Sequence, residues 1–240
     1  MAPIRNYSNW NKRPTDEEEQ IEPYKKFFFI CEGANTEVWY FKKLIDLRKQ
    51  LGIHPLIDIC LLEKTEEDRQ ISYPMQLIIF AEAQKSNPDL HFDRDHDEMI
   101  IVFDADIFET KSPAYPDILA AASSSGDIVA VTNPAFELFL LLHFENSFET
   151  DILPNAEEIL KNEKDGNYTY IYRLLQHRTG INSKTNSRIG ELALNVETAI
   201  AQEVYLNQDP VTCKGQLTCN IGKIIDSIRK STVPNASEPA

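Results

Sequence analysis

Apolar runs alternate with helix-forming segments through the first 150 residues of the chain. An uninterrupted apolar run is typical of a strand covered on both faces, and apolar positions at helical spacing indicate a helix. We therefore predict strands at 27–31, 55–63, 99–108 and 128–131, and helices at 36–51, 74–86, 113–126 and 135–144. Strands that alternate with helices favour an α/β fold with a parallel sheet of about four strands and right-handed crossovers.

The pattern changes after residue 149, where strand signals fade and short amphipathic segments follow one another. Helices are predicted at 155–166, 169–180, 186–206 and 219–231. The third of these places Ile189, Leu192, Val196, Ile200 and Val204 on one face. The expected organisation is a flexible polar tail at 1–24, an α/β core at 25–150, a helical part at 151–232 packed on the core, and a frayed tail at 233–240.

The predicted first and third strands both end in acidic residues. Glu32 follows the first strand, Asp104 and Asp106 end the third on one side of the chain, and Gly33 permits a sharp turn beside Glu32. In the simplest strand order, 2-1-3-4, these two strands are neighbours and their carboxyl ends form the ligand-binding edge. Converging carboxylates would repel unless a hard cation such as Mg²⁺ or Mn²⁺ lay between them. The alternative is that each is an ordinary solvated loop residue or helix cap.

The charge of the chain argues against a general nucleic-acid binder, because the formal net charge is −14. Residues 1–160 carry 14 basic and 30 acidic residues, and residues 161–240 carry 10 basic and 8 acidic residues. The first part would therefore repel a polyanion unless a divalent metal ion or a partner intervened. Phosphate contacts are expected in the second part, where the candidates are Arg173, Arg178, Lys184 and Arg188. Scattered surface cations without a ligand are the alternative.

Three tyrosines alternate in the second part of the chain, at Tyr168, Tyr170 and Tyr172. They could stack on nucleic-acid bases. An aromatic edge packed against the core explains the same pattern without a ligand, and we favour that interpretation.

Two further features indicate a cytoplasmic protein. No run approaches the roughly 18 apolar residues of a membrane span, and the N-terminus lacks the apolar region of a secretory signal. The four cysteines form no Cys-x-x-Cys pair, and Cys31 and Cys60 fall in apolar strand runs, as expected for buried thiols.

The acidic positions also carry a family resemblance. Glu-Gly after the first strand and Asp-x-Asp after the third resemble the Toprim domain of topoisomerases, primases and related nucleases. More specifically, the blocks ICEGANTEVWYF, VFDAD and NPAFELFLLLHFE resemble the RloB family, which is associated with bacterial phage defence and restriction loci. This resemblance implies a Toprim-like fold and a metal-dependent nuclease. It makes Glu32 a metal ligand or general acid/base, and makes Asp104 and Asp106 the metal-binding pair.

Four other polar residues fall in the same blocks. Glu37 occupies the second acidic position of the RloB motif, and either supplements the site or caps its helix. Asn133 and Glu137 lie one turn apart near the sheet's carboxyl edge, and for Asn133 a core hydrogen bond explains the residue as well as a substrate contact does. A structural role is favoured for His143. Ala105 stands between the aspartates, where many relatives carry a basic side chain.

These observations lead to two hypotheses. The first is a phosphodiesterase that cleaves DNA or RNA with one or two divalent ions, in phage defence (abortive infection), with an ATPase as partner. The second is a non-catalytic scaffold that docks an ATPase, another partner or a second copy through the 186–206 helix. Nucleotidyl transfer is disfavoured, because the sequence shows no separate base pocket or zinc module.

Overall fold

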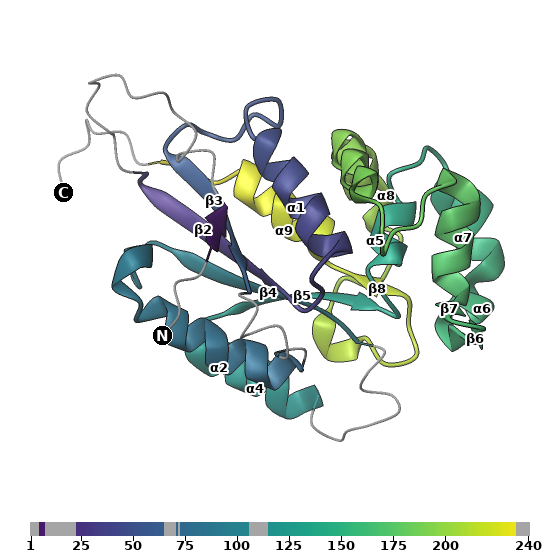
Figure 1. Ribbon diagram of the computed structural model, residues 1–240, viewed down its shortest axis with the longest axis horizontal. Coiled ribbons are helices and arrows are strands. Elements are labelled where there is room, and N and C mark those ends of the chain that lie inside the picture. Colours follow the sequence, from purple (N-terminus) through teal and green to yellow (C-terminus); the bar gives the residue numbers. More distant parts are fainter. Residues whose placement is uncertain (1–4, 8–22, 65–70, 72, 106–114, 234–240) are drawn as a thin grey trace.

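A computed structural model describes residues 5–7, 23–64, 71, 73–105 and 115–233 of the chain. Within these residues a six-stranded sheet has the order β1-β3-β2-β4-β5-β8 (Figure 1). Its strands are β1 (Arg5–Tyr7), β2 (Lys25–Cys31), β3 (Ile57–Glu63), β4 (Glu98–Asp104), β5 (Ile128–Asn133) and β8 (Thr218–Cys219). β2 is parallel to β3 and β4, and β4 is parallel to β5. The predicted α/β class and the predicted order of the four parallel strands are confirmed.

The two outer strands of this sheet are antiparallel, and neither was predicted. β1 pairs with β3, although it falls within the segment expected to be a flexible tail. β8 pairs with β5 by joining Thr132 to Cys219 and Asn133 to Thr218. That pairing extends β5 to Asn133, beyond the predicted strand end at residue 131.

Helices cover both faces of the sheet (Figure 1). Phe27, Phe29 and Cys31 of β2 pack in the core that includes α1, α5, α8 and α9, while Phe28 and Ile30 pack in the core with α2 and α4. Successive side chains of a strand point to opposite faces, so an unbroken apolar run serves both cores at once. The helices of the two layers are α1 (Thr36–Asp46), α5 (Glu137–Leu141), α8 (Val196–Glu203) and α9 (Ile221–Arg229) on one face, and α2 (Pro74–Lys85) and α4 (Tyr115–Ser125) on the other.

The remaining short elements lie mostly in the second part of the chain. They are η2 (Pro88–Leu90), the π-helix η3 (Phe148–Ile152), η4 (Leu153–Asn155), α6 (Ala156–Lys161), β6 (Lys164–Asp165), β7 (Tyr168–Thr169), α7 (Tyr170–Thr179), η5 (Ser187–Asn195) and η6 (Pro210–Thr212). The helices expected near 155–166 and 169–180 are therefore present as α6 and α7. Among the described residues, no helix has the length and apolar character needed to cross a membrane.

The single helix predicted at 186–206 is instead two elements, the 3₁₀ helix η5 followed by α8. η5 packs closely on α1, where a Cβ at Gly190 would lie 2.5 Å from the backbone oxygen of Trp39. α8 ends at Glu203, whose carboxylate accepts hydrogen bonds from the backbone N–H groups of Gly222 and Lys223 at the start of α9. Because the helix stops there, Val204 is 61% exposed, and its predicted place on the buried face was wrong.

Candidate functional site

Glu32 and Asp104 lie together at the carboxyl edge of the sheet. Glu32 directly follows β2, Asp104 is the last residue of β4, and these two strands are hydrogen-bonded neighbours. The backbone N–H of Asp104 donates to Oε2 of Glu32 over 3.3 Å. The hydroxyl of Thr132, on β5, donates to Oδ1 of Asp104 over 2.6 Å. Asp106 lies outside the described residues.

Glu37 lies in the first turn of α1, with its carboxylate against Gly33, the residue that follows Glu32. A Cβ added at Gly33 would overlap the Glu37 carboxylate, so the absence of a side chain at Gly33 provides the space for that carboxylate. Desolvation raises the pKa of Glu37 above its ordinary value, the positive charge of Lys184 works against this rise, and the negative charge of Glu137 adds to it. A hydrogen bond from its own backbone N–H also lowers that pKa, so the Glu37 carboxylate both neighbours the charged groups at this edge and binds the start of α1.

Glu137 is almost completely buried at the start of α5 and binds two groups through one oxygen. Its Oε1 accepts a hydrogen bond from Oγ of Ser183 over 3.1 Å and forms an ion pair with Nζ of Lys184 over 2.8 Å. Desolvation lowers the Lys184 pKa, but attraction to Glu137, and then to Glu37 and Asp104, outweighs it and raises that pKa above the ordinary value. The ammonium of Lys184 thus lies within electrostatic reach of three of the carboxylates.

The segment that carries Lys184 is also bonded to the start of α1. Oγ1 of Thr36 donates to the carbonyl oxygen of Ser183 over 2.9 Å, and Nδ2 of Asn35 donates to that of Lys184 over 3.0 Å. Two main-chain carbonyls are fixed in this way, so the position of Lys184 follows from tertiary contacts with both α1 and α5.

A second lysine, Lys64, borders the edge from β3 and was missed by the sequence analysis. Its Nζ donates to the carbonyl oxygens of Glu32 and Ile71 over 2.6 and 2.7 Å. Desolvation lowers its pKa, while Cys31, Glu32 and Glu37 act to raise it. The available signal was its place directly after the second strand, which the predicted strand order puts next to the strand that ends before Glu32.

Asn133 and His143 are buried and form hydrogen bonds within the fold. Nδ2 of Asn133 donates to the carbonyl oxygens of Cys213 and Gln216, each over 2.9 Å. Nδ1 of His143 lies 3.0 Å from the carbonyl oxygen of Phe139 and must donate there, since a carbonyl only accepts. Nε2 of the neutral ring then accepts the hydroxyl of Tyr40 over 2.9 Å. Burial lowers the His143 pKa to about 4, which keeps the ring neutral.

The other predicted phosphate contacts form ion pairs of their own. Arg173 pairs with Asp165 over 3.1 Å, and Arg178 approaches Asp151 at 4.0 Å. Arg188 approaches Glu191 within η5, also at 4.0 Å. Of the four predicted cations, Lys184 is the one whose contacts lie at the acidic edge.

The acidic residues at this edge carry oxygen atoms of the kind that a hard cation binds. Glu32, Glu37 and Asp104 offer carboxylate oxygens, which are the ligands that Mg²⁺ and Mn²⁺ prefer. In the part of the chain that the structure describes, no group of three or more His, Cys, Asp or Glu side chains is arranged to hold a metal ion. A complete ligand set would therefore draw on Asp106, water or substrate oxygens as well.

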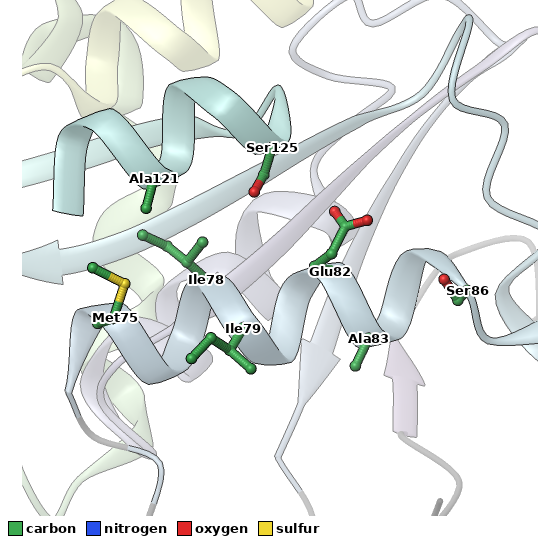
Figure 2. Close-up of a pocket in the computed structure, with 8 residues that line it drawn as sticks. All are labelled: Met75, Ile78, Ile79, Glu82, Ala83, Ser86, Ala121 and Ser125. Atoms are coloured by element: carbon green, nitrogen blue, oxygen red, sulfur yellow. The ribbon is translucent and has the colours of Figure 1, made fainter. Parts of the chain in front are cut away.

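A separate hollow lies between α2 and α4, on the other side of the sheet from α1. This open groove of about 500 Å³ contains none of the predicted site residues (Figure 2). It is lined by Met75, Ile78, Ile79, Glu82, Ala83, Ser86, Ala121 and Ser125.

Comparison with known proteins adds one finding. The curated proteins and the solved structures gave no match to the chain. The family model described as RloB-like protein matches residues 27–228. That span runs from the third residue of β2 through most of α9 and includes every described residue named at the acidic edge. The chain therefore belongs to the RloB-like protein family.

Proposed function

We propose that this protein is a divalent-metal-dependent phosphodiesterase that acts on nucleic acid. The observation that carries the proposal is the approach of Glu32 and Asp104 at the carboxyl ends of the neighbouring strands β2 and β4. In a doubly wound sheet this edge is where ligands bind. Each carboxylate accepts a hydrogen bond that holds it at this edge, and phosphodiester hydrolysis requires charge stabilisation at such a position.

Glu32, Asp104 and Asp106 would hold Mg²⁺ or Mn²⁺, and Glu37 would supplement the site. When bound, the metal would lower the pKa of a water molecule and stabilise the leaving oxygen. The Thr132 hydroxyl, bonded to Oδ1 of Asp104, orients that carboxylate.

Lys64 and Lys184 would reduce the electrostatic repulsion between this acidic protein and the phosphates of a nucleic-acid substrate. Both ammonium groups lie within electrostatic reach of the carboxylates. A phosphate that approaches the edge would meet these cations as well as the anions, so local repulsion is smaller than the net charge of −14 suggests.

The same two lysines favour a second candidate function, a non-catalytic scaffold. Their charges offset the acidic residues of the folded protein in the absence of metal, as a purely structural cluster would require. In the 186–206 segment, η5 packs Ile189, Gly190 and Ala193 into its own domain, so docking of a partner would use the exposed side chains of Leu194, Val204 and Tyr205.

A role in phage defence together with an ATPase partner completes the proposal, and it rests on the family resemblance alone. It predicts that bacteria expressing the protein with its partner restrict phage growth, and that Glu32→Gln removes this protection. Normal protection by that variant would contradict a catalytic role in defence.

The direct test incubates the purified protein with plasmid, single-stranded DNA and total tRNA, with Mn²⁺, with Mg²⁺ or with EDTA. The wild type should cleave at least one substrate only with metal, and Glu32→Gln and Asp104→Asn should abolish cleavage while leaving the fold intact. Glu191→Gln is the matched control, since its carboxylate is exposed on η5, and it should retain full activity. Full activity in either edge variant would refute the assignment.

Calorimetric titration with Mn²⁺ separates the two candidates. A nuclease should bind Mn²⁺ and lose that binding in Asp104→Asn. A scaffold should bind none, and its Glu32→Gln variant should be more stable to urea than the wild type, because one source of repulsion has been removed.

A further inference from the structure

Two of the three alternating tyrosines form a stacked pair next to the site. The rings of Tyr168, on β7, and Tyr172, on α7, are nearly parallel, with an interplanar angle of 9° and centroids 4.4 Å apart. Tyr172 is buried, as the sequence analysis favoured, but Tyr168 remains 41% exposed. The hydroxyl of Tyr170 instead donates to Asn155 and takes no part in the stack. An exposed aromatic ring is therefore held in place by a buried ring beneath it.

The stacked pair is electrostatically linked to the acidic edge. α7 packs against α5, the helix that begins with Glu137. After burial and the neighbouring Tyr168, the charges of Glu137 and Lys184 are the next influences on the pKa of Tyr172. Lys184 in turn lies within reach of Glu37 and Asp104. Tyr168 thus stacks on a residue of α7, and α7 packs against the helix whose first residue, Glu137, binds Lys184 over 2.8 Å.

We propose that Tyr168 is a stacking platform for a base of single-stranded nucleic acid, with Lys184 contacting the adjoining phosphate. This inference rests on the proposed function and names its substrate class. A base stacked on Tyr168 would extend the existing ring pair by one layer, and the ammonium of Lys184, whose side chain is 52% exposed, is accessible to a phosphate. The strand would then continue toward the edge that holds Glu32 and Asp104.

Single strands fit this arrangement better than duplexes for two physical reasons. Bases of a single strand expose their faces, whereas duplex bases are already stacked on one another, and stacking on an aromatic side chain is tolerant of sequence. A duplex also carries a denser line of phosphate charge, about one per 1.7 Å, and the net charge of the protein, −14, disfavours its approach.

The experiment measures binding, so that it does not depend on cleavage. Fluorescence anisotropy would follow a labelled single-stranded DNA and a single-stranded RNA of the same sequence, an abasic strand of equal length and the matching duplex, in EDTA and again with Ca²⁺. The chain offers a matched control in Tyr205, which is 60% exposed and stacks on Phe148 with a centroid distance of 5.0 Å. Tyr168→Leu is compared with Tyr168→Ala because leucine still covers Tyr172 but removes the aromatic face.

Tyr168→Ala and Tyr168→Leu should weaken single-strand binding by roughly tenfold, while Tyr168→Phe and Tyr205→Ala stay within about twofold of the wild type. The wild type should bind the abasic strand and the duplex more weakly, with little effect of the Tyr168 variants. The relative affinities for DNA and RNA identify the preferred strand. Wild-type affinity in Tyr168→Leu, equal affinity for the abasic strand, or no binding by the wild type would each overturn the inference. Absence of metal-dependent cleavage, with these affinities as expected, would count against the catalytic proposal alone.

Discussion

Replacing Lys184 by Met should destabilise the protein, because it removes the ammonium from a buried carboxylate. The Glu137 side chain is only 2% exposed, and its Oε1 would keep Ser183 as its hydrogen-bond donor but lose the ion pair. Methionine is close to lysine in length and preserves the apolar stem, so the substitution isolates the charge. The expected result is a lower free energy of unfolding for Lys184→Met.

The magnitude follows from the distance and the exposure of the pair. Two unit charges 2.8 Å apart attract by about 6 kcal/mol at an effective dielectric constant of about 20, which is an upper limit before desolvation is subtracted. Breaking a fully buried pair costs about 3–5 kcal/mol. Because 52% of the Lys184 side chain is exposed and therefore screened, we expect a loss of about 2 kcal/mol.

Urea denaturation at neutral pH measures this loss of stability. Two further variants test whether the loss comes from the ion pair between Lys184 and Glu137. Arg188→Met removes an exposed cation 4.0 Å from Glu191 and should change the free energy of unfolding by less than about 0.5 kcal/mol. Lys184→Met combined with Glu137→Gln should regain most of the stability, since the amide oxygen still accepts from Ser183 and no buried charge remains. If the double variant were as unstable as Lys184→Met, or if Lys184→Met matched the Arg188→Met control, the ion pair would not have the role assigned to it.

Gly190→Ala should destabilise the fold by about 1–3 kcal/mol because its Cβ would meet the backbone of Trp39, which cannot move aside; unchanged urea stability would contradict the close packing of η5 on α1. Gly33→Ala should leave stability nearly unchanged but weaken Mn²⁺ binding measured by calorimetry, because its Cβ displaces only the flexible end of Glu37; wild-type affinity would show that this carboxylate position is unimportant. For His143, the folded pKa of about 4 lies below the unfolded value of about 6.5, so the unfolded chain binds the extra proton between these values. The free energy of unfolding should therefore fall by about 3 kcal/mol as the pH drops from 6.5 to 4. His143→Gln should show a smaller decrease in urea titrations over this range, and an equal decrease would exclude His143 as its source.

The central strands and their order could be predicted because each depends on a local pattern. An apolar run such as 27–31 can be recognised as a strand without knowledge of the rest of the fold. Because the strands alternate with helices, only a few strand orders keep every connection short and right-handed. The same reasoning places Glu32 and Asp104 on adjacent strand ends, and the structure brings them to a hydrogen-bonding distance.

Local pattern was misleading where one element ends because of another. The apolar residues across 186–206 have helical spacing, yet the segment forms two elements: η5, which packs on α1 at Gly190, and α8, which ends where Glu203 binds the start of α9. β8 has only two residues and owes its conformation to pairing with β5, so its sequence alone carries almost no strand signal.

By itself, the sequence determined the four parallel strands of the sheet, the layers on its two faces and the meeting of two acidic strand ends, since these follow from periodicity and chain direction. Only the tertiary structure decided which cations join them. Lys184 is fixed by hydrogen bonds from Asn35 and Thr36, which are 149 and 147 residues away from their partners along the chain. Contacts between residues so far apart in the sequence depend on how whole helices and strands pack together. They cannot be predicted from local sequence periodicity.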